Sequence, residues 1–115
     1  MFWGKIAIIN LYECNSKVIR NKKDIRKFII ELCKQIDMKR EGELLIKRFG
    51  EGDLEGYSAV QFIQTSSITL HFDEAKNRAF IDIFSCKNFD GKKAENFSRE
   101  FFNARNSKIK TIIRK

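Results

Sequence analysis

Two stretches in which apolar residues recur at helical spacing restrict most strongly how this chain can fold. The first follows Asn21, which precedes Asp24 by three residues, and this pair is typical of a helix start. The second follows Asp90, a residue type that often caps a helix. In each stretch the apolar residues form one stripe: Ile25, Phe28, Ile29, Leu32, Cys33 and Ile36 in the first, and Ala94, Phe97, Phe101 and Ala104 in the second. Two such amphipathic helices need a common layer to pack against.

Strand-like segments before, between and after the two helices supply that layer. They are short and apolar or alternating, and turn-forming residues separate them. We predict strands over residues 4–12, 43–49, 58–64, 66–72, 79–86 and 109–113, with a turn cluster at residues 50–53 and Thr65, Ser66 and Ser67 between the third and fourth strands. The order β-α-β-β-β-β-α-β favours an α+β fold, a two-layer α/β sandwich whose mainly antiparallel sheet carries both helices on one face.

The composition fits a single domain spanning residues 1–115. Lysine and arginine number 23 against 15 aspartates and glutamates, which gives a net charge of +8, and 43% of the residues are hydrophobic, as in globular domains. No apolar run approaches the roughly 20 residues that span a bilayer, and Lys5 interrupts the apolar start, so we expect no membrane partner and no signal peptide. Three widely spaced cysteines and one histidine disfavour disulfides and a metal site and favour a cytoplasmic location.

Polar residues that interrupt or end the apolar strands are the candidates for chemistry. They are Ser58, the Ser66-Ser67 pair, His71 and Cys86. Each also has an ordinary structural explanation, because serines form turns, a lone histidine is often a hydrogen-bonded structural residue, and a cysteine can be a small core residue. Taken singly, none of these residues identifies a function.

Their joint spacing resembles the S-adenosylmethionine decarboxylase proenzyme family in its short prokaryotic form. That family has a serine that becomes a pyruvoyl group, a histidine five residues later, a cysteine twenty residues later and a second serine eight residues earlier. Ser66, His71, Cys86 and Ser58 stand at these intervals. The segments Leu11-Tyr12-Glu13-Cys14-Asn15 and Lys47-Arg48-Phe49 also resemble family segments, so the likeness extends over nearly the whole chain.

The resemblance implies that the chain cuts itself between Thr65 and Ser66. The Ser66 hydroxyl would attack the Thr65 carbonyl and form an ester, and loss of the Ser66 α-proton would release the new chain end and lead to a pyruvoyl group. His71 would take that proton, because histidine readily accepts a proton near neutral pH, and Ser58 would assist by hydrogen bonding. In a regular strand Ser66 and His71 lie on opposite faces, so the two residues can meet only if Ser66 lies in the turn before the strand or a bulge intervenes.

The resemblance also implies a pyruvoyl-dependent carboxy-lyase of polyamine (spermidine) biosynthesis. The pyruvoyl group made from Ser66 would form a Schiff base with the amine of S-adenosylmethionine, and Cys86 would donate the proton after carbon dioxide leaves. Phe49 would stack on the adenine, and no metal and no separate cofactor would be needed. The resemblance further implies a homodimer with its sites at the interface.

Substrate recognition differs from the family pattern. The family has a glutamate before the cleaved serine and another that holds the substrate ribose, and this chain has Thr65 and Ala75 at these positions. Because the substrate is a cation, local acids must compensate for the positive net charge, and we expect Glu13 and Glu74 to bind it. The loop over residues 50–57 is longer than is usual in the family.

Three alternatives stay open. The same chemistry on ornithine or arginine would explain Ala75, and a non-cleaving, non-catalytic homologue would explain Thr65 and Ser67. The basic composition is also compatible with a nucleic-acid-binding domain. We expect no nucleic-acid partner, because the basic residues are scattered over the predicted helices and no aromatic-basic RNA-recognition signature lies in a central strand.

Overall fold

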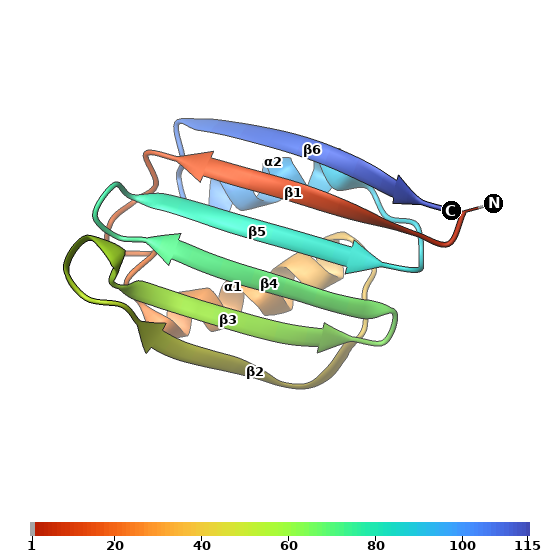
Figure 1. The fold of residues 1–115 in the computed structure, drawn as a ribbon, viewed down its shortest axis with the longest axis horizontal. Coiled ribbons are helices and arrows are strands. Elements are labelled where there is room, and N and C mark those ends of the chain that lie inside the picture. Colours follow the sequence, from red (N-terminus) through yellow and green to blue (C-terminus); the bar gives the residue numbers. More distant parts are fainter. Residues whose placement is uncertain (1) are drawn as a thin grey trace.

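The computed structural model describes residues 2–115 and has the predicted order of elements (Figure 1). The element bounds are β1 Gly4–Tyr12, α1 Lys22–Gln35, β2 Arg40–Phe49, a one-turn 3-10 helix η1 Gly52–Leu54, β3 Gly56–Ile63, β4 Ser66–Asp73, β5 Arg78–Ser85, α2 Gly91–Phe101 and β6 Asn106–Arg114. The predicted helices and strands are all present, and their ends shift by three residues or fewer. The α+β fold class is confirmed.

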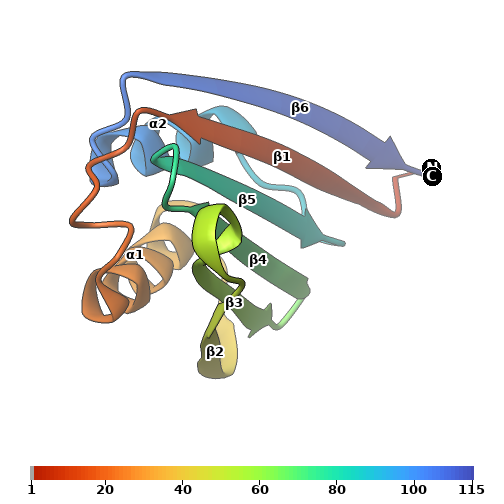
Figure 2. The ribbon, with the colours of Figure 1, turned by 60° about the vertical axis from the view of Figure 1, so that its left-hand side comes forward.

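The six strands form one antiparallel sheet in the order β2-β3-β4-β5-β1-β6. Consecutive hairpins join β2 to β5, and β1 then lies between β5 and β6. Both helices pack on the same face of the sheet, which we call the inner face, and neither covers the other, outer face (Figure 2). The two-layer arrangement predicted from the sequence is therefore correct.

Helix starts follow the predicted capping residues. The Asn21 side chain accepts a hydrogen bond from the Asp24 N–H at 3.1 Å, and the Asp90 side chain accepts one from the Lys93 N–H at 3.0 Å. Each cap satisfies a backbone donor that the first helical turn leaves unpaired. Within residues 2–115, no helix is both long and apolar enough to cross a membrane.

The core lies between the helices and the inner face of the sheet. Alternation along each strand sends one set of side chains into it, for example Ile68, Leu70 and Phe72 from β4. Phe28 of α1 packs against Phe102 with ring centroids 4.6 Å apart, and Phe102 also packs against Phe72. Aromatic contacts thus tie both helical regions to the centre of the sheet.

The outer face combines exposed apolar side chains with two of the candidate catalytic residues, Ser58 and His71. Strand register places Leu45, Phe49 and Phe62 on this face, and each is more than half exposed. Its two ends differ: η1 and the β4–β5 turn lie at one end, and the β3–β4 turn and the end of β5 lie at the other (Figure 1). We call these the η1 end and the hairpin end.

Candidate active site

The expected cleavage point lies at the hairpin end. Gln64 and Thr65 form the tight turn between β3 and β4, and Ser66 is the first residue of β4. The Thr65 carbonyl accepts a hydrogen bond from the Cys86 N–H at 3.0 Å. This bond draws electron density from the carbonyl that Ser66 would attack, and the same N–H can stabilise an oxyanion that forms there.

A second contact holds the Thr65 side chain. Its hydroxyl lies 2.8 Å from the Ser85 hydroxyl, and the Ser85 oxygen also accepts a hydrogen bond from the Lys87 N–H at 2.9 Å. Ser85 is fully buried. The turn is therefore fixed to the end of β5 through both its backbone and its side chain.

The backbone at Ser66 is strained. Its φ of 155° lies outside the range that residues with a side chain favour. Ser85 contacts both residues of the cleavage point: it is paired with Ser66 in the sheet, and its side chain contacts the Thr65 hydroxyl. Strain at the residue that would react is consistent with a chain poised for a backbone rearrangement.

The condition under which Ser66 and His71 would meet within one chain is not fulfilled, because Ser66 lies in the regular strand β4 on the face opposite His71. Ser66 is paired with Ile63 on one side and Ser85 on the other, and neither ladder contains a register shift. Ser67 also lies in β4. Cross-strand pairing on both sides extends β4 to Ser66, so the turn is limited to two residues.

Ser58 and His71 form a hydrogen-bonded pair toward the η1 end. They are opposite each other in the β3–β4 ladder, and Ser58 Oγ lies 2.9 Å from His71 Nδ1. Both project from the outer face, where His71 is exposed. The hydrogen bond orients the imidazole, as a base that must take a proton from one position requires.

Within one chain, this pair and Ser66 do not come together. Five residues of extended strand separate Ser66 from His71, which corresponds to about 16 Å at about 3.3 Å per residue. No bulge shortens that distance, and no hydrogen bond joins the two residues in the part of the chain that the structure describes. Within one chain, Ser66 and the Ser58–His71 pair therefore lie at different ends of β4.

Cys86 differs from the other two cysteines. It follows β5 directly, beside the cleavage point, and its side chain is exposed. Cys14 and Cys33 are buried, and burial raises the pKa of each thiol to about 11. Only the Cys86 thiol is thus placed to exchange a proton with a bound molecule.

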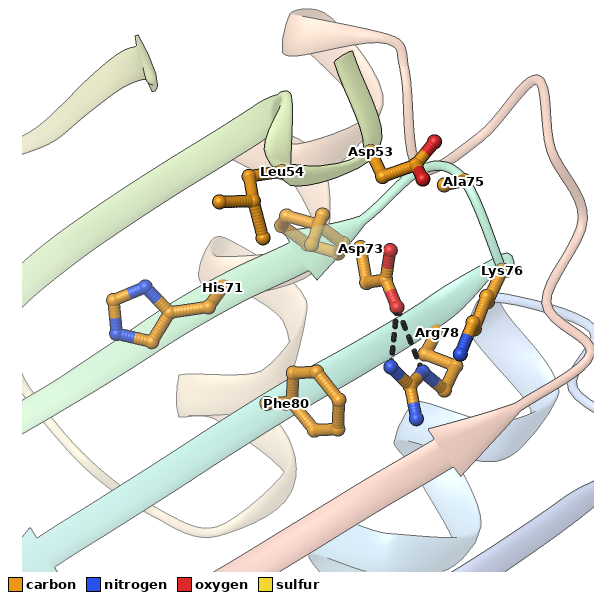
Figure 3. A pocket seen from close by; sticks show the side chains of 9 residues that line it. Asp53, Leu54, His71, Asp73, Ala75, Lys76, Arg78 and Phe80 are labelled. Atoms are coloured by element: carbon orange, nitrogen blue, oxygen red, sulfur yellow. Dashed lines mark hydrogen bonds and ion pairs between the residues drawn. The ribbon is translucent and has the colours of Figure 1, made fainter. Parts of the chain in front are cut away.

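A cleft of about 520 Å³ lies at the η1 end of the outer face (Figure 3). Its walls come from η1, the end of β4, the β4–β5 turn and the start of β5, and its lining residues are Asp53, Leu54, His71, Phe72, Asp73, Ala75, Lys76, Arg78 and Phe80. The Asp73 carboxylate forms an ion pair with Arg78 across its floor at 2.6 Å. The cleft thus includes the imidazole of the Ser58–His71 pair.

Glu74, an expected substrate-binding residue, is buried in an ion-pair network. Arg48 donates to both of its carboxylate oxygens at 2.6 Å, and Arg20 lies 3.5 Å from it. The hydrogen bonds to Glu74 and to Glu55 raise the pKa of the Arg48 guanidinium above its ordinary value. The role of Arg48 was not predicted, because nothing in the local sequence pairs Arg48 with a residue 26 positions away.

The remaining expected substrate contacts lie at the same end. Phe49 ends β2 on the outer face and is 56% exposed, so its ring is free to contact a ligand. Glu13 follows β1, is exposed and lies 3.8 Å from Arg105. Ala75 lines the cleft and brings no polar group to it.

Comparisons with known proteins identify the family of the chain. A family model described as S-adenosylmethionine decarboxylase matches residues 5–115. The chain belongs to the S-adenosylmethionine decarboxylase family. Members of this family of carboxy-lyases carry a pyruvoyl group derived from their own chain.

Similar proteins extend over nearly the whole chain. The S-adenosylmethionine decarboxylase proenzyme of Clostridium botulinum (strain Langeland) is 30% identical over 112 residues, which cover 96% of this chain and 93% of that protein. The Clostridium kluyveri proenzyme (strain NBRC 12016) is 27% identical over 96% of this chain and 86% of its own length. A crystal structure of the adenosylmethionine decarboxylase from Aquifex aeolicus has a TM-score of 0.81 at 18% identity and covers 98% of this chain and 91% of that one, so the two share the fold.

Proposed function

We propose that this family member is a self-cleaving, pyruvoyl-dependent decarboxylase of S-adenosylmethionine that serves polyamine biosynthesis. The observation that carries the proposal is the hydrogen bond from the Cys86 N–H to the Thr65 carbonyl, next to a serine with a strained backbone. A donor on the carbonyl and a nucleophile on the following residue are what an attack of that hydroxyl requires.

Cleavage uses only groups of the chain and one water molecule. The Ser66 oxygen bonds to the Thr65 carbonyl carbon while the carbon–nitrogen bond between the two residues breaks, which leaves an ester and a free Ser66 amine. A base removes the Ser66 α-proton, and the electron pair expels the Thr65 carboxylate from the β-carbon. Water then replaces the nitrogen as ammonia and leaves the ketone of a pyruvoyl group. Ser66 fits this role because it directly follows Thr65, whose carbonyl is polarised by the Cys86 N–H.

The base comes from a second copy of the chain. One protomer holds Ser66 and Cys86 at the hairpin end of the sheet, and it holds His71 on the outer face toward the η1 end. If two outer faces pack against each other about a two-fold axis that runs across the strands, each hairpin end meets the η1 end of the other copy. The exposed apolar residues of that face, including Trp3, Leu45, Phe49, Phe62 and Ile112, would be buried in such a homodimer.

Cys86 and Phe49 would supply the proton donor and the nucleoside contact of the decarboxylation site. A pyruvoyl ketone supplies an electron sink for the amine substrate. The exposed Cys86 thiol lies at the cleavage point and donates the proton that replaces the carboxylate. Phe49 and the cleft at the η1 end would hold the nucleoside.

Cleavage is the first test. The purified protein is expected to give two fragments on intact-mass analysis, divided between Thr65 and Ser66, with the second beginning in a pyruvoyl group. The Ser66→Ala variant should stay uncut, and His71→Ala should be cut at least about 100-fold more slowly, the usual scale of a lost general base. An uncut wild-type chain without carbon dioxide release would instead support the non-catalytic homologue.

A second candidate substrate is a basic amino acid, ornithine or arginine. Two observations favour it: Ala75 offers the cleft no polar group, and the Glu74 carboxylate is occupied by Arg48. Release of labelled carbon dioxide from S-adenosylmethionine, ornithine and arginine by the cleaved protein distinguishes the two substrates.

A further inference from the structure

One carboxylate in the cleft at the η1 end has no partner within the protein. Asp53 and Asp73 are the two acids that line the cleft, and Asp73 is neutralised by Arg78. Among residues 2–115, no hydrogen bond or ion pair involves the Asp53 side chain. Asp53 can therefore give both of its oxygens to a bound molecule.

The turn that carries Asp53 is held in a defined position. Arg48 donates from Nε to Glu55 at 2.7 Å and from its two terminal nitrogens to Glu74, so one guanidinium joins the end of η1 to the β4–β5 turn. Gly50 has a φ of 81°, and a Cβ there would lie 2.1 Å from the Leu54 carbonyl oxygen. These contacts hold η1 next to the β4–β5 turn, and Asp53 and Ala75 line the same cleft (Figure 3).

The other residues of the cleft indicate which kind of ligand group the Asp53 carboxylate would bind. Leu54 and Phe80 provide apolar walls between Asp53 and His71, and the volume is within the range of sites for cofactor-sized ligands. Lys76 also lines the cleft without an ion-pair partner in the described chain, and its charge disfavours a second cation there. A neutral group with hydroxyl donors, attached to a flat apolar body, suits this end better than an ammonium or a guanidinium.

We infer that Asp53 is a specificity-determining residue that binds the ribose hydroxyls of the substrate nucleoside. The inference rests on the proposed function and adds a residue to its site: the longer β2–β3 loop supplies a carboxylate beside the alanine at position 75. Two neighbouring ribose hydroxyls can each donate to one oxygen of the carboxylate. Asp53 would then determine binding and leave the reacting bonds to Ser66, His71 and Cys86.

The test separates nucleoside binding from cleavage and turnover. The probe is 5′-methylthioadenosine, which has the adenosine end of the substrate but lacks the α-amino group that would react with a pyruvoyl ketone. It is titrated calorimetrically into the uncut Ser66→Ala protein. Adding Asp53→Asn should raise the dissociation constant of the probe about tenfold or more, because hydrogen bonds to a charged group are lost. Glu51→Gln is the matched control, because Glu51 lies in the same loop and does not line the cleft.

Two further measurements make the test specific. Removing the ribose 2′-hydroxyl from the probe should weaken binding to the Asp53 protein and change it little in Asp53→Asn. Ala75→Glu, combined with Asp53→Asn, should restore affinity, because it returns a carboxylate to the same part of the cleft. Melting temperatures of all variants show that each one is folded.

Other outcomes would overturn the inference. Unchanged affinity in Asp53→Asn, or no binding of the probe by the uncut protein, removes the role assigned to Asp53. If Asp53→Asn weakens ornithine or arginine binding and leaves the nucleoside unaffected, Asp53 recognises a distal cation instead. A wild-type chain that never cleaves but still binds the nucleoside through Asp53 would refute the proposed enzyme and leave this inference standing.

Discussion

Ser85 is the residue that fixes the side chain of the expected cleavage point. Its buried hydroxyl lies 2.8 Å from the Thr65 hydroxyl and accepts from the Lys87 N–H. Ser85→Ala removes both interactions and leaves the Thr65 hydroxyl without this partner. We expect cleavage to slow about fivefold, which corresponds to the roughly 1 kcal/mol of a typical hydrogen bond.

The rate is measured by following fragment formation by mass spectrometry after synthesis of the chain. Ser98→Ala is the control, since Ser98 is also a buried serine, but its hydroxyl has no hydrogen-bond partner within residues 2–115. Its replacement should leave the cleavage rate unchanged. Equal rates for wild type and Ser85→Ala would show that the Thr65 side chain needs no support.

At the level of single residues, the sequence predicted the family but not the contacts between residues of different strands. The spacing of Ser58, Ser66, His71 and Cys86 indicated the family, and the structure places Cys86 beside the turn that precedes Ser66. Spacing did not show that Ser58 and His71 form a pair far along the strand from Ser66. It also did not show that Arg48 occupies Glu74. Such contacts depend on which residues of different strands face each other, and no short stretch of sequence contains that information.

Helices and strands were predictable because their signals are local. The apolar stripe and the capping residues Asn21 and Asp90 mark both helices, and each cap is formed as expected. Strand ends were less accurate: β2 begins at Arg40 rather than at residue 43, and β6 begins at Asn106 rather than at residue 109. Pairing with neighbouring strands determines where these strands begin, and the strand propensity of the residues alone does not predict that pairing.

Helix α2 is attached to β6 by a buried carboxylate. Glu95 accepts from the Ser107 hydroxyl at 2.7 Å and from the Lys92 ammonium at 3.0 Å. Burial raises the pKa of Glu95, but the hydrogen bonds and the positive charges outweigh burial, so the net effect lowers that pKa. A carboxyl with a lowered pKa in the folded state stabilises the fold above its unfolded pKa, and this contribution is lost as the pH falls through the folded value.

Glu95→Gln is therefore expected to destabilise the protein in a pH-dependent way. At pH 7 the free energy of unfolding should fall by about 2 kcal/mol, the scale of hydrogen bonds to a charged group. The difference from wild type should begin to shrink as the pH falls below about 4.3, the ordinary pKa of glutamate, because the unfolded chain then binds a proton at Glu95, and it should vanish below the lowered pKa of the folded protein. Urea unfolding at pH 7 and pH 3 measures both values. A difference that is the same at both would show that the charge is not what attaches α2.

The molecule as a whole divides its chemistry between the two ends of one sheet. The hairpin end carries the polarised Thr65 carbonyl, Ser66 and Cys86, and the η1 end carries the Ser58–His71 pair and the cleft. The Ser58–His71 pair lies on the face that the helices leave uncovered, whereas alternation along β4 places Ser66 on the same face as Ile68 and Leu70. Both helices pack on the inner face, and the proposed homodimer would cover the outer face and bring the two ends of the sheet together.

Mixing two inactive variants tests this division directly. Ser66→Ala retains His71 but has nothing to cleave, and His71→Ala retains Ser66 but lacks its base. If the base comes from the other copy, a mixed dimer has one complete site, and the His71→Ala chain should be cut when both chains are produced together. Because random pairing places half of all chains in mixed dimers, about half of the His71→Ala chains should be cleaved, as counted by mass spectrometry. If His71 acted within its own chain, neither variant would be cleaved in any mixture, and dimer assembly would have no part in forming the site.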